Sequence, residues 1–479
     1  MDNAHYIIHR VTLDLEAPDA AAARRIQDEA VRIFYHWILP KLEELLDRLV
    51  PKDVVFRLDS LDLDLEQLEM ASFEQNFGDA LLRDFEEKIE QIVASSPNYQ
   101  AEKTSAPCTA MVEGERGFST FLFFLATGRL PWWSEQHPDA LQEDVLTALT
   151  QETVYLRDDA ARQLATLLGT DDTALDRLSL QFSPAFLHHI ILLLLRSSGL
   201  TGTDQLRSLI NNCLERLDSR EQDFLFSNVA VNQEFLKRII RLLAGSAASS
   251  THLNSEQLRH QLGEILQELQ NYAREGAEHP PEIVQLQSSP ATPADNRQDD
   301  AEQPPLQKEE KENGICVAHA GLVLLHPFLE YYFRDFNLLN EHEFRDASAR
   351  TQAIHLLHYL AAGEESPPEY LLTFEKFLCG ADLLTPVPRF LPLSEPMQEE
   401  SEKLLQAAIG HWQALKRTSP AGLREGFLQR PGKLLLSSFQ NRLVIESKAH
   451  DVLLNYLPWG YGIIKLPWLK QPLFVDWVA

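Results

Sequence analysis

A long polar segment in the second half of the chain limits what this sequence can fold into. Residues 276–313 read GAEHPPEIVQLQSSPATPADNRQDDAEQPPLQKEEKEN, rich in proline, glutamine and charge and poor in aliphatic residues. Such a segment cannot bury enough apolar surface to offset the conformational entropy that folding would cost. We therefore predict a disordered tether over residues 276–313, which fully stretched would span on the order of 120 Å at about 3.3 Å per residue.

The composition of the whole chain supports folded regions on both sides of the tether. Hydrophobic residues make up 44% of the 479 residues, which suits about two to four domains with real cores. The chain has 43 Lys and Arg against 71 Asp and Glu, a formal net charge of -28. A surface this acidic repels phosphate backbones and anionic lipid heads, so we expect no nucleic-acid partner.

No targeting segment, membrane span or disulfide framework is predicted. The N-terminal MDNAHYIIHR is acidic and polar where a secretory signal is basic and then apolar. The longest aliphatic run, Ile190–Leu195, is far shorter than the roughly 20 apolar residues of a span. The four cysteines form no CxxC pair, which fits a reducing cytoplasm.

Residues 1–97 combine a period-2 pattern with a helical one. Val11, Leu13 and Leu15 alternate with polar residues, which predicts a half-buried strand. The expected elements are strands within His5–Ala17 and Val54–Leu68 and helices over Pro18–Leu49 and Phe73–Val93. We predict a small strand–helix–strand–helix α+β module here, followed by a linker over residues 98–116.

Residues 117–275 are dominated by leucine at helical spacing. A short apolar helix is predicted to stop at Gly128, after which the chain folds back through LPWW, residues 130–133. Polar interruptions then fall near Thr170–Thr173, Ser183–Pro184, Ser197–Thr203, Ser219 and Asn232. Short helices with such breaks indicate stacked helical hairpins, and a further amphipathic helix is predicted over Ser255–Glu275.

Residues 314–479 are predicted to form a mixed domain that begins with helices. Lys433–Lys448 has the pattern of a hairpin turning around Gln440–Asn441, and a helix is expected over Ala449–Leu457. The last strand pieces, GIIKLPW and PLFVDW, contain Pro467 and Pro472, which we expect to restrict them to edges or bulges. The chain as a whole is therefore predicted to be α+β and predominantly α-helical.

The chemistry-bearing residues predict no catalytic, cofactor-binding or metal site. His355 and His358 lie one helical turn apart, a spacing that can chelate zinc, but the H-E-x-x-H pattern is missing. We expect these histidines to be packed or half-exposed, like His188, His189, His319 and His326. Cys379 stands at a predicted helix end, where the helix dipole disfavours a thiolate, so we expect a small buried apolar residue.

Tryptophan gathers in two short stretches, and its role there has two possible interpretations. The residues are Trp132, Trp133, Trp459, Trp468 and Trp477. Tryptophan combines a large apolar area with a hydrogen-bonding edge and is enriched at protein interfaces. These side chains either close the cores of their own domains or contact a partner, and we treat all five as candidate partner contacts.

The C-terminal LPWGYGIIKLPWLKQPLFVDW resembles the end of the tape measure proteins of contractile injection systems, phage-tail-like particles that drive a tube through a target membrane. Other stretches resemble the same family in the same order: HYIIHRVTLDLE, RLDSLDLDLEQL, FLATGRLPWW, AHAGLVLLHPFL, HLLHYLAAGE and IGHWQALKRTSPAGLREGFLQRPGKL. In AHAGLVLLHPFL, His319 stands where the family usually has Asn. The leucine-rich middle and the tether are similar to the family only in character.

The resemblance implies a non-catalytic assembly protein that sets the length of a tube and sheath. It implies no cofactor and no small-molecule substrate. The partners it implies are the tube, the baseplate hub or spike and the cap, with assembly in the bacterial cytoplasm before incorporation in the particle. An alternative is an assembly chaperone or adaptor of the same particle that docks a partner through its tryptophan-rich C-terminus. A hydrolase is a third interpretation, and it would require a pocket with convergent polar groups.

Overall fold

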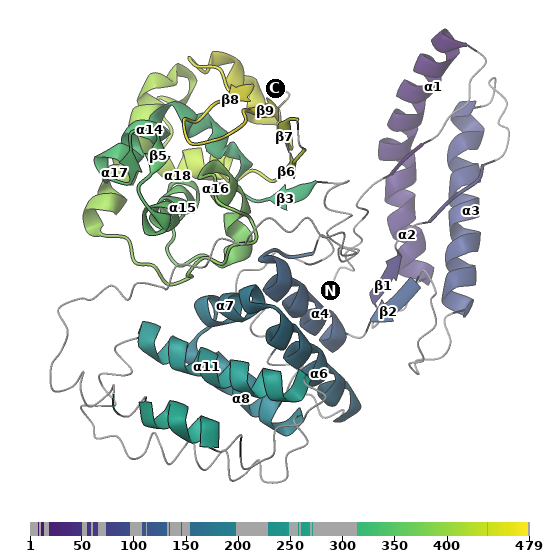
Figure 1. Cartoon of the computed structure of the whole chain (residues 1–479). Helices are drawn as coiled ribbons and strands as arrows, with labels where there is room; N and C mark the ends of the chain where they lie inside the picture. Colours follow the sequence, from purple (N-terminus) through teal and green to yellow (C-terminus); the bar gives the residue numbers. More distant parts are fainter. Residues whose placement is uncertain are drawn as a thin grey trace. The chain divides into compact units, whose positions relative to one another are not determined.

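The structure is a computed structural model that divides into two compact units (Figure 1). It describes residues 8, 11–13, 19–49, 55–58, 61–65, 73–95, 108–111, 113–131, 134, 145, 154–197, 229–248, 257, 260–268, 271, 314–437 and 439–477. The first unit comprises Met1–Thr120, Trp132–Glu135 and Glu143–Gln151. The second comprises Phe121–Pro131, Gln136–Gln142 and Glu152–Ala479. The predicted tether, residues 276–313, lies outside the described residues.

Two long antiparallel helical segments form the first unit (Figure 1). The predicted first helix is confirmed as α1 (Ala20–Ile33), a π-helical turn η1 (Phe34–Ile38) and α2 (Leu39–Leu49). The predicted second helix is α3 (Phe73–Ser95). The π turn ends two residues before Pro40, whose ring cannot continue an undisturbed α-helix. Gly78 lets the helices approach, since a Cβ there would meet the Trp37 ring at 2.0 Å.

The strands of the first unit differ from the prediction. Strand β1 (Val55–Leu58) pairs antiparallel with β2 (Cys108–Met111), which comes from the segment predicted as a linker. The prediction of a strand around Val11 is wrong for residues 11–13, because these residues are not in a strand. Residues 61–65 also lie outside a strand, although their leucines are half-buried and their aspartates exposed. In this segment a side chain of α3 takes the place of a neighbouring strand: the Asp84 carboxylate accepts a hydrogen bond from the Asp64 amide at 3.1 Å.

All but one of the described helices in the first part of the second unit follow the predicted breaks. Their bounds are α4 (Glu113–Thr127, shared with the first unit), α6 (Val154–Thr170), α7 (Asp172–Gln181), α8 (Pro184–Ser197) and α11 (Val229–Ala248). Gly128, at φ +74°, ends α4 as predicted. Asp171 caps α7 by accepting from the Thr173 amide at 2.8 Å.

One predicted break in this helical region is wrong. Helix α11 begins at Val229 and runs through Asn232, because its apolar face packs against α6 and α8 and outweighs the weak helix propensity of one asparagine. The break predicted near Ser219 lies outside the described residues. Residues 260–268 are helical, as predicted for the amphipathic segment Ser255–Glu275.

A five-stranded mixed sheet organises the C-terminal part of the second unit. Its strands, in spatial order, are β3 (Ile315–Val317), β6 (Gly432–Leu435), β7 (Asn441–Ile445), β9 (Leu473–Asp476) and β8 (Ile463–Ile464). The predicted hairpin is confirmed as β6–β7, with Gly432 opposite Ile445. Strand β8 is an edge strand, but β9 lies between β7 and β8 in regular register, so the expectation that proline restricts both pieces to edges or bulges is wrong for β9. Pro472 precedes β9 and leaves its ladder intact.

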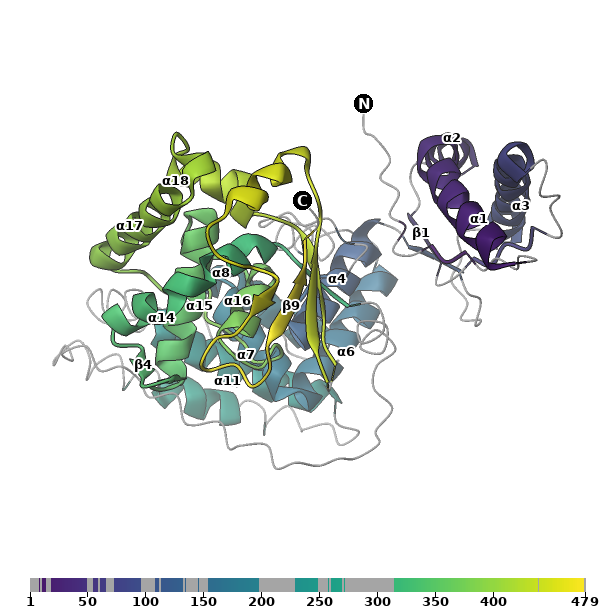
Figure 2. The same ribbon diagram turned by 90° about the horizontal axis from the view of Figure 1, so that it is seen from above.

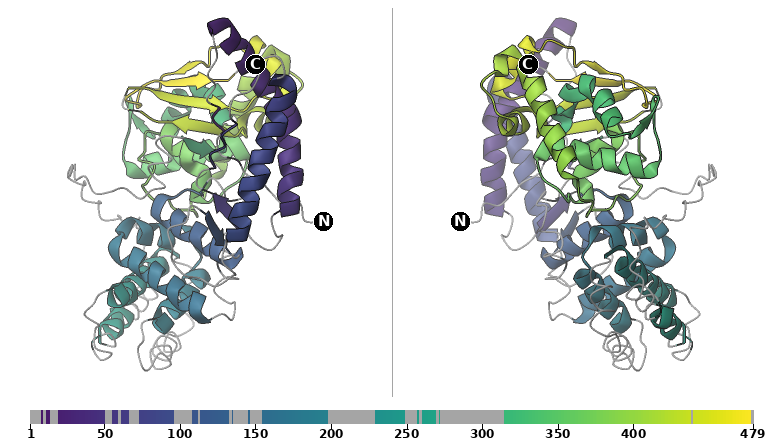
Figure 3. Two further views of the ribbon diagram at one scale, coloured as in Figure 1. Left: turned by 90° about the vertical axis from the view of Figure 1, so that its right-hand side faces the viewer. Right: turned by 90° about the vertical axis from the view of Figure 1, so that its left-hand side faces the viewer.

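Helices lie along one side of this sheet (Figures 2 and 3). They are η3 (Ala320–Leu325), α14 (His326–Asp335), α15 (Ala347–Ala362), η4 (Glu369–Leu372), α16 (Thr373–Leu378), α17 (Glu395–His411), η5 (Gln413–Leu415), α18 (Pro420–Leu423), η6 (Arg424–Leu428) and η7 (Ala449–Tyr456). A short hairpin, β4 (Leu339–Asn340) and β5 (Glu343–Phe344), precedes α15. The predicted helix over Ala449–Leu457 is the 3-10 helix η7.

Helix α15 is the central element of this core. Asp346 caps its start by accepting from the Ala349 amide at 2.7 Å, and Gly363, at φ +75°, ends it. Buried residues cover most of its circumference, so it is enclosed by η3, α16, α17 and η6. Among the described helices, none is both long enough and apolar enough to cross a membrane.

Candidate functional site

The three C-terminal tryptophans tie the last stretch of the chain to distant parts of the second unit. Trp459 donates its indole N–H to the Leu324 carbonyl of η3 at 2.9 Å. Trp468 donates to the Leu378 carbonyl of α16 at 2.7 Å. Trp477 is buried and donates to Asp451 Oδ2 at 3.0 Å. Each indole N–H therefore has an acceptor within the chain, and these rings help to close the C-terminal core.

The predicted partner contacts of the tryptophans stay a prediction. Trp132 and Trp133 lie outside the described residues. Near the other three, Val452, Tyr456 and Ile463 expose 54%, 68% and 61% of their surface. These exposed apolar side chains, together with the half-buried Trp459 and Trp468, are part of the described apolar surface at this end of the chain.

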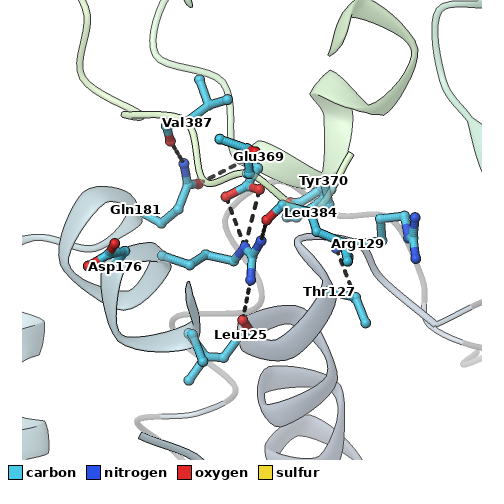
Figure 4. A network of polar contacts seen from close by, with 12 residues as sticks. Leu125, Thr127, Arg129, Asp176, Gln181, Glu369, Tyr370, Leu384 and Val387 are labelled. Atoms are coloured by element: carbon cyan, nitrogen blue, oxygen red, sulfur yellow. Dashed lines mark hydrogen bonds and ion pairs between the residues drawn. The ribbon is translucent and has the colours of Figure 1, made fainter. Parts of the chain in front are cut away.

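A buried ionic network joins α7 to η4 and α16 (Figure 4). The Arg177 Nε lies 3.1 Å from both carboxylate oxygens of Glu369, and neither side chain is exposed. Lys376 donates to Glu369 Oε1 at 2.5 Å and to the Thr385 carbonyl at 2.8 Å. Two cations thus share one carboxylate inside the protein.

Backbone groups complete the hydrogen bonds of this network. The other two Arg177 nitrogens donate to the carbonyls of Leu125 and Leu384. Gln181, also on α7, accepts from the Glu369 amide at 2.8 Å and donates to the Val387 carbonyl at 2.6 Å (Figure 4). The absence of a Cβ at Gly128 makes room, because one would meet Glu369 Oε1 at 2.4 Å.

The ionic network is tolerated in the core because its charged groups have hydrogen-bond partners, and not because the ion pairs attract one another strongly. Burial lowers the pKa of Lys376, and the charge of Glu369 opposes that effect. Moving charges out of water costs several kcal/mol each, so a buried pair is favourable only when its hydrogen bonds are satisfied. These residues were not predicted from the sequence. The one signal was a charged residue, Arg177, between apolar positions of a helix, and nothing local pointed to Glu369.

A second buried cluster contains two of the histidines considered above. His319 precedes η3, His358 lies on α15 and Glu375 lies on α16. His319 Nδ1 donates to Glu375 Oε1 at 2.6 Å, and His358 Nδ1 lies 3.8 Å from the same oxygen, too far for a hydrogen bond. The fold therefore pairs His358 with His319 and Glu375, whereas the sequence suggested His355 as its neighbour.

His355 points elsewhere, as its partner shows. Its Nε2 bonds the Pro388 carbonyl at 2.8 Å, and burial lowers the pKa of His355 to about 4. His355 is thus a packed histidine, as predicted. His188 and His326 are half-buried, as predicted. His189 is exposed, which departs from the prediction, and its Nδ1 bonds the Ala185 carbonyl at 2.8 Å.

The pKa shifts of the titratable groups around α16 indicate a structural role for these side chains rather than a reactive one. Burial would raise the pKa of Glu375, but the charge and hydrogen bond of His319 bring it down to about 2. Burial and the Glu375 charge raise the pKa of the Cys379 thiol well above its usual value. Cys379 is therefore a buried neutral thiol, as predicted, and a weak nucleophile.

Comparison with known proteins places the chain in a family. No match was found among curated proteins or among solved structures. A family model described as contractile injection system tape measure protein matches residues 4–477. This match includes both tryptophan-rich stretches, the helices around the ionic network and the whole mixed sheet. The chain therefore belongs to the contractile injection system tape measure protein family.

Proposed function

We propose that this chain acts as a non-catalytic assembly protein that sets the length of the tube and sheath of a contractile injection particle. The observation that carries the proposal is the family match over residues 4–477, which leaves little of the chain for another function. The buried polar clusters support it, because their described side chains are enclosed by the core rather than open to a substrate.

The proposed partners are the tube, the baseplate hub or spike and the cap, and the proposed place of assembly is the bacterial cytoplasm. A chain that spans a tube must hold onto something at each end. We assign one attachment to residues 1–97 and the other to residues 314–479, with the linker 98–116, the helical region 117–275 and the tether 276–313 between them. These boundaries remain our proposal for the domains.

The ruler role requires a second, more extended state of the helical region. In the state described here, α7 is fastened to η4 and α16 by Arg177, Glu369 and Lys376. Extension would expose these charges to water, which solvates them well, so the main loss is the apolar packing around them. We infer that contacts with the particle compensate for that loss.

Assembly without the protein tests this function. In cells that produce all particle components except this chain, we expect either no particles or particles of scattered length by electron microscopy. Supplying the chain from a plasmid should restore a single length. Particles of normal, uniform length without the chain would contradict the proposal.

An adaptor role is the second candidate, and the exposed side chains at the C-terminal end favour it. An adaptor would stay folded and dock a partner through Val452, Tyr456 and Ile463, which are close in sequence to the half-buried Trp459 and Trp468. Replacing Tyr456 and Ile463 by Ser should then reduce particle number while leaving length unchanged. The exposed Leu384, replaced by Ser, is a matched control away from this end.

A further inference from the structure

Three side chains that commonly bind metal ions converge inside the C-terminal core. His319 comes from the turn before η3, His358 from α15 and Glu375 from α16. One donor atom of each lies within 4.8 Å of the other two. Their side chains are 8%, 3% and 0% exposed, so the surrounding core holds them in place.

Two polar atoms of this cluster are left without a hydrogen bond. Among the described residues, neither His358 Nδ1 nor Glu375 Oε2 has a partner, although both are buried. An unsatisfied buried polar atom destabilises the folded state and is rare in folded proteins. Both atoms belong to the same cluster, which indicates a missing ligand rather than two unrelated defects.

We propose that His319, His358 and Glu375 form a binding site for a divalent transition metal ion of the zinc class. Imidazole nitrogens and a carboxylate are typical zinc ligands, whereas calcium and magnesium prefer six or more oxygens. One Glu375 oxygen and one nitrogen of each histidine give three protein donors, and a water molecule completes a four-coordinate set. His358 Nδ1 becomes a ligand, the bound water donates a hydrogen bond to Glu375 Oε2, and the ion fastens η3, α15 and α16 to one another.

The distances require only a small opening of the cluster. Donors around a tetrahedral zinc ion at about 2.0–2.2 Å stand roughly 3.3–3.6 Å apart. The His358–Glu375 distance of 3.8 Å is already close to that value. The His319–Glu375 distance of 2.6 Å must lengthen, because an ion replaces the proton shared by that pair. His319 binds as the neutral imidazole, with its remaining proton on Nε2, and the carboxylate keeps its charge to balance the ion.

Metal binding by the full-length protein, purified without a histidine tag and freed of metal with a chelator, tests the site. We expect titration calorimetry with Zn²⁺ to give about one tight site per chain, and thermal unfolding of the second unit to shift to higher temperature with Zn²⁺. Bound Co²⁺ should show the visible absorption of a four-coordinate ion. No stoichiometric binding would overturn the proposal.

Matched variants assign the ligands. His358→Gln and Glu375→Gln should each weaken Zn²⁺ binding at least ten-fold, and His319→Asn, which keeps a side chain able to bond Glu375, should do the same while preserving the fold. His355→Gln and His189→Gln are controls, since the first is bonded to Pro388 and the second is exposed. Circular dichroism identifies any variant that fails to fold. Binding that survives in every folded ligand variant, or that is lost in His189→Gln, would overturn the assignment.

Discussion

Arg177 donates hydrogen bonds from each of its three guanidinium nitrogens. Its acceptors lie on α4, on η4 and in the loop after α16, so this one side chain fixes α7 to all three segments. Planar geometry and a permanent charge make arginine suited to such a junction, and lysine could not replace it without leaving acceptors unpaired. The carboxylate of Glu369 offsets the desolvation cost of burying the charged side chains of Arg177 and Lys376.

Removing that carboxylate should be strongly destabilising. We expect Glu369→Ala to lower the free energy of unfolding of the second unit by about 3–5 kcal/mol, because it leaves two buried cations without their anion. Urea unfolding followed by circular dichroism measures the change. Glu330→Ala, which removes the partly exposed partner of Arg334, is the matched control and should cost about 0–1 kcal/mol. Equal effects of the two substitutions would show that the buried network is not important.

His355 should make the fold sensitive to mild acid. Burial lowers its pKa from 6.5 to about 4 in the folded state, so below pH 6.5 the unfolded chain takes up a proton that the folded chain does not. Stability is therefore lost as the pH falls from about 6.5 to about 4, by at most about 3 kcal/mol for this residue.

The substitution His355→Gln isolates this contribution. Glutamine keeps a donor for the Pro388 carbonyl but does not titrate, so the urea midpoint should fall less steeply between pH 6.5 and 4 than in the natural protein. His342→Gln, at an exposed histidine, is the matched control with which the slope of His355→Gln is compared. An unaltered slope in His355→Gln would mean that the ring is protonated in the folded state at these pH values.

At the scale of elements, regular local patterns predicted structure well and long-range contacts did not follow from them. Helices α3, α6, α7 and α8 and the β6–β7 hairpin agree with the predicted segments because their periodicity and end signals are local. The strand expected at Val11 failed because alternation cannot identify a partner, and the partner of β1 was β2, from a segment without that signal. The His319–His358–Glu375 cluster was missed for the same reason: three elements had to be brought together first.

The contact of η3 with η6 gives a test at this scale. A Cβ on Gly321 would lie 1.7 Å from the Phe427 carbonyl oxygen, a backbone atom that cannot move alone. We expect Gly321→Ala to lower the unfolding free energy by about 1–3 kcal/mol or more through overpacking. Gly410→Ala is the matched control: it lies in α17 with nothing within 4 Å, so it should stabilise by roughly 0.5–1 kcal/mol. A tolerated Gly321→Ala would contradict the close packing of η3 on η6.

At the scale of the whole molecule, membership in a tape measure family and a folded helical region must be reconciled. Helices α6, α7, α8 and α11 pack into one body in the state described here. Our proposal of two states accounts for both facts, with a packed chain before assembly and an extended helical region within the particle. The net charge of -28 helps to keep the free chain from associating before assembly.

Hydrogen exchange separates the two states. In the free protein we expect the amides of α7 to be protected, because Arg177 and Gln181 fasten this helix to the C-terminal part. In purified particles the α7 amides should exchange faster, while those of α15, buried in the C-terminal core, should stay protected as an internal reference. Equal protection of α7 in both samples would argue that the helical region does not open.

The length of assembled particles tests the ruler role most directly. A series of in-frame deletions and duplications of about 20–40 residues between Pro138 and Gly245 should shorten and lengthen the particles in proportion, by about 1.5 Å per residue if the region is helical in the particle. Electron microscopy gives the length distribution for each variant. Particles of unchanged length, formed at normal yield across the series, would contradict the account and leave the adaptor role in its place.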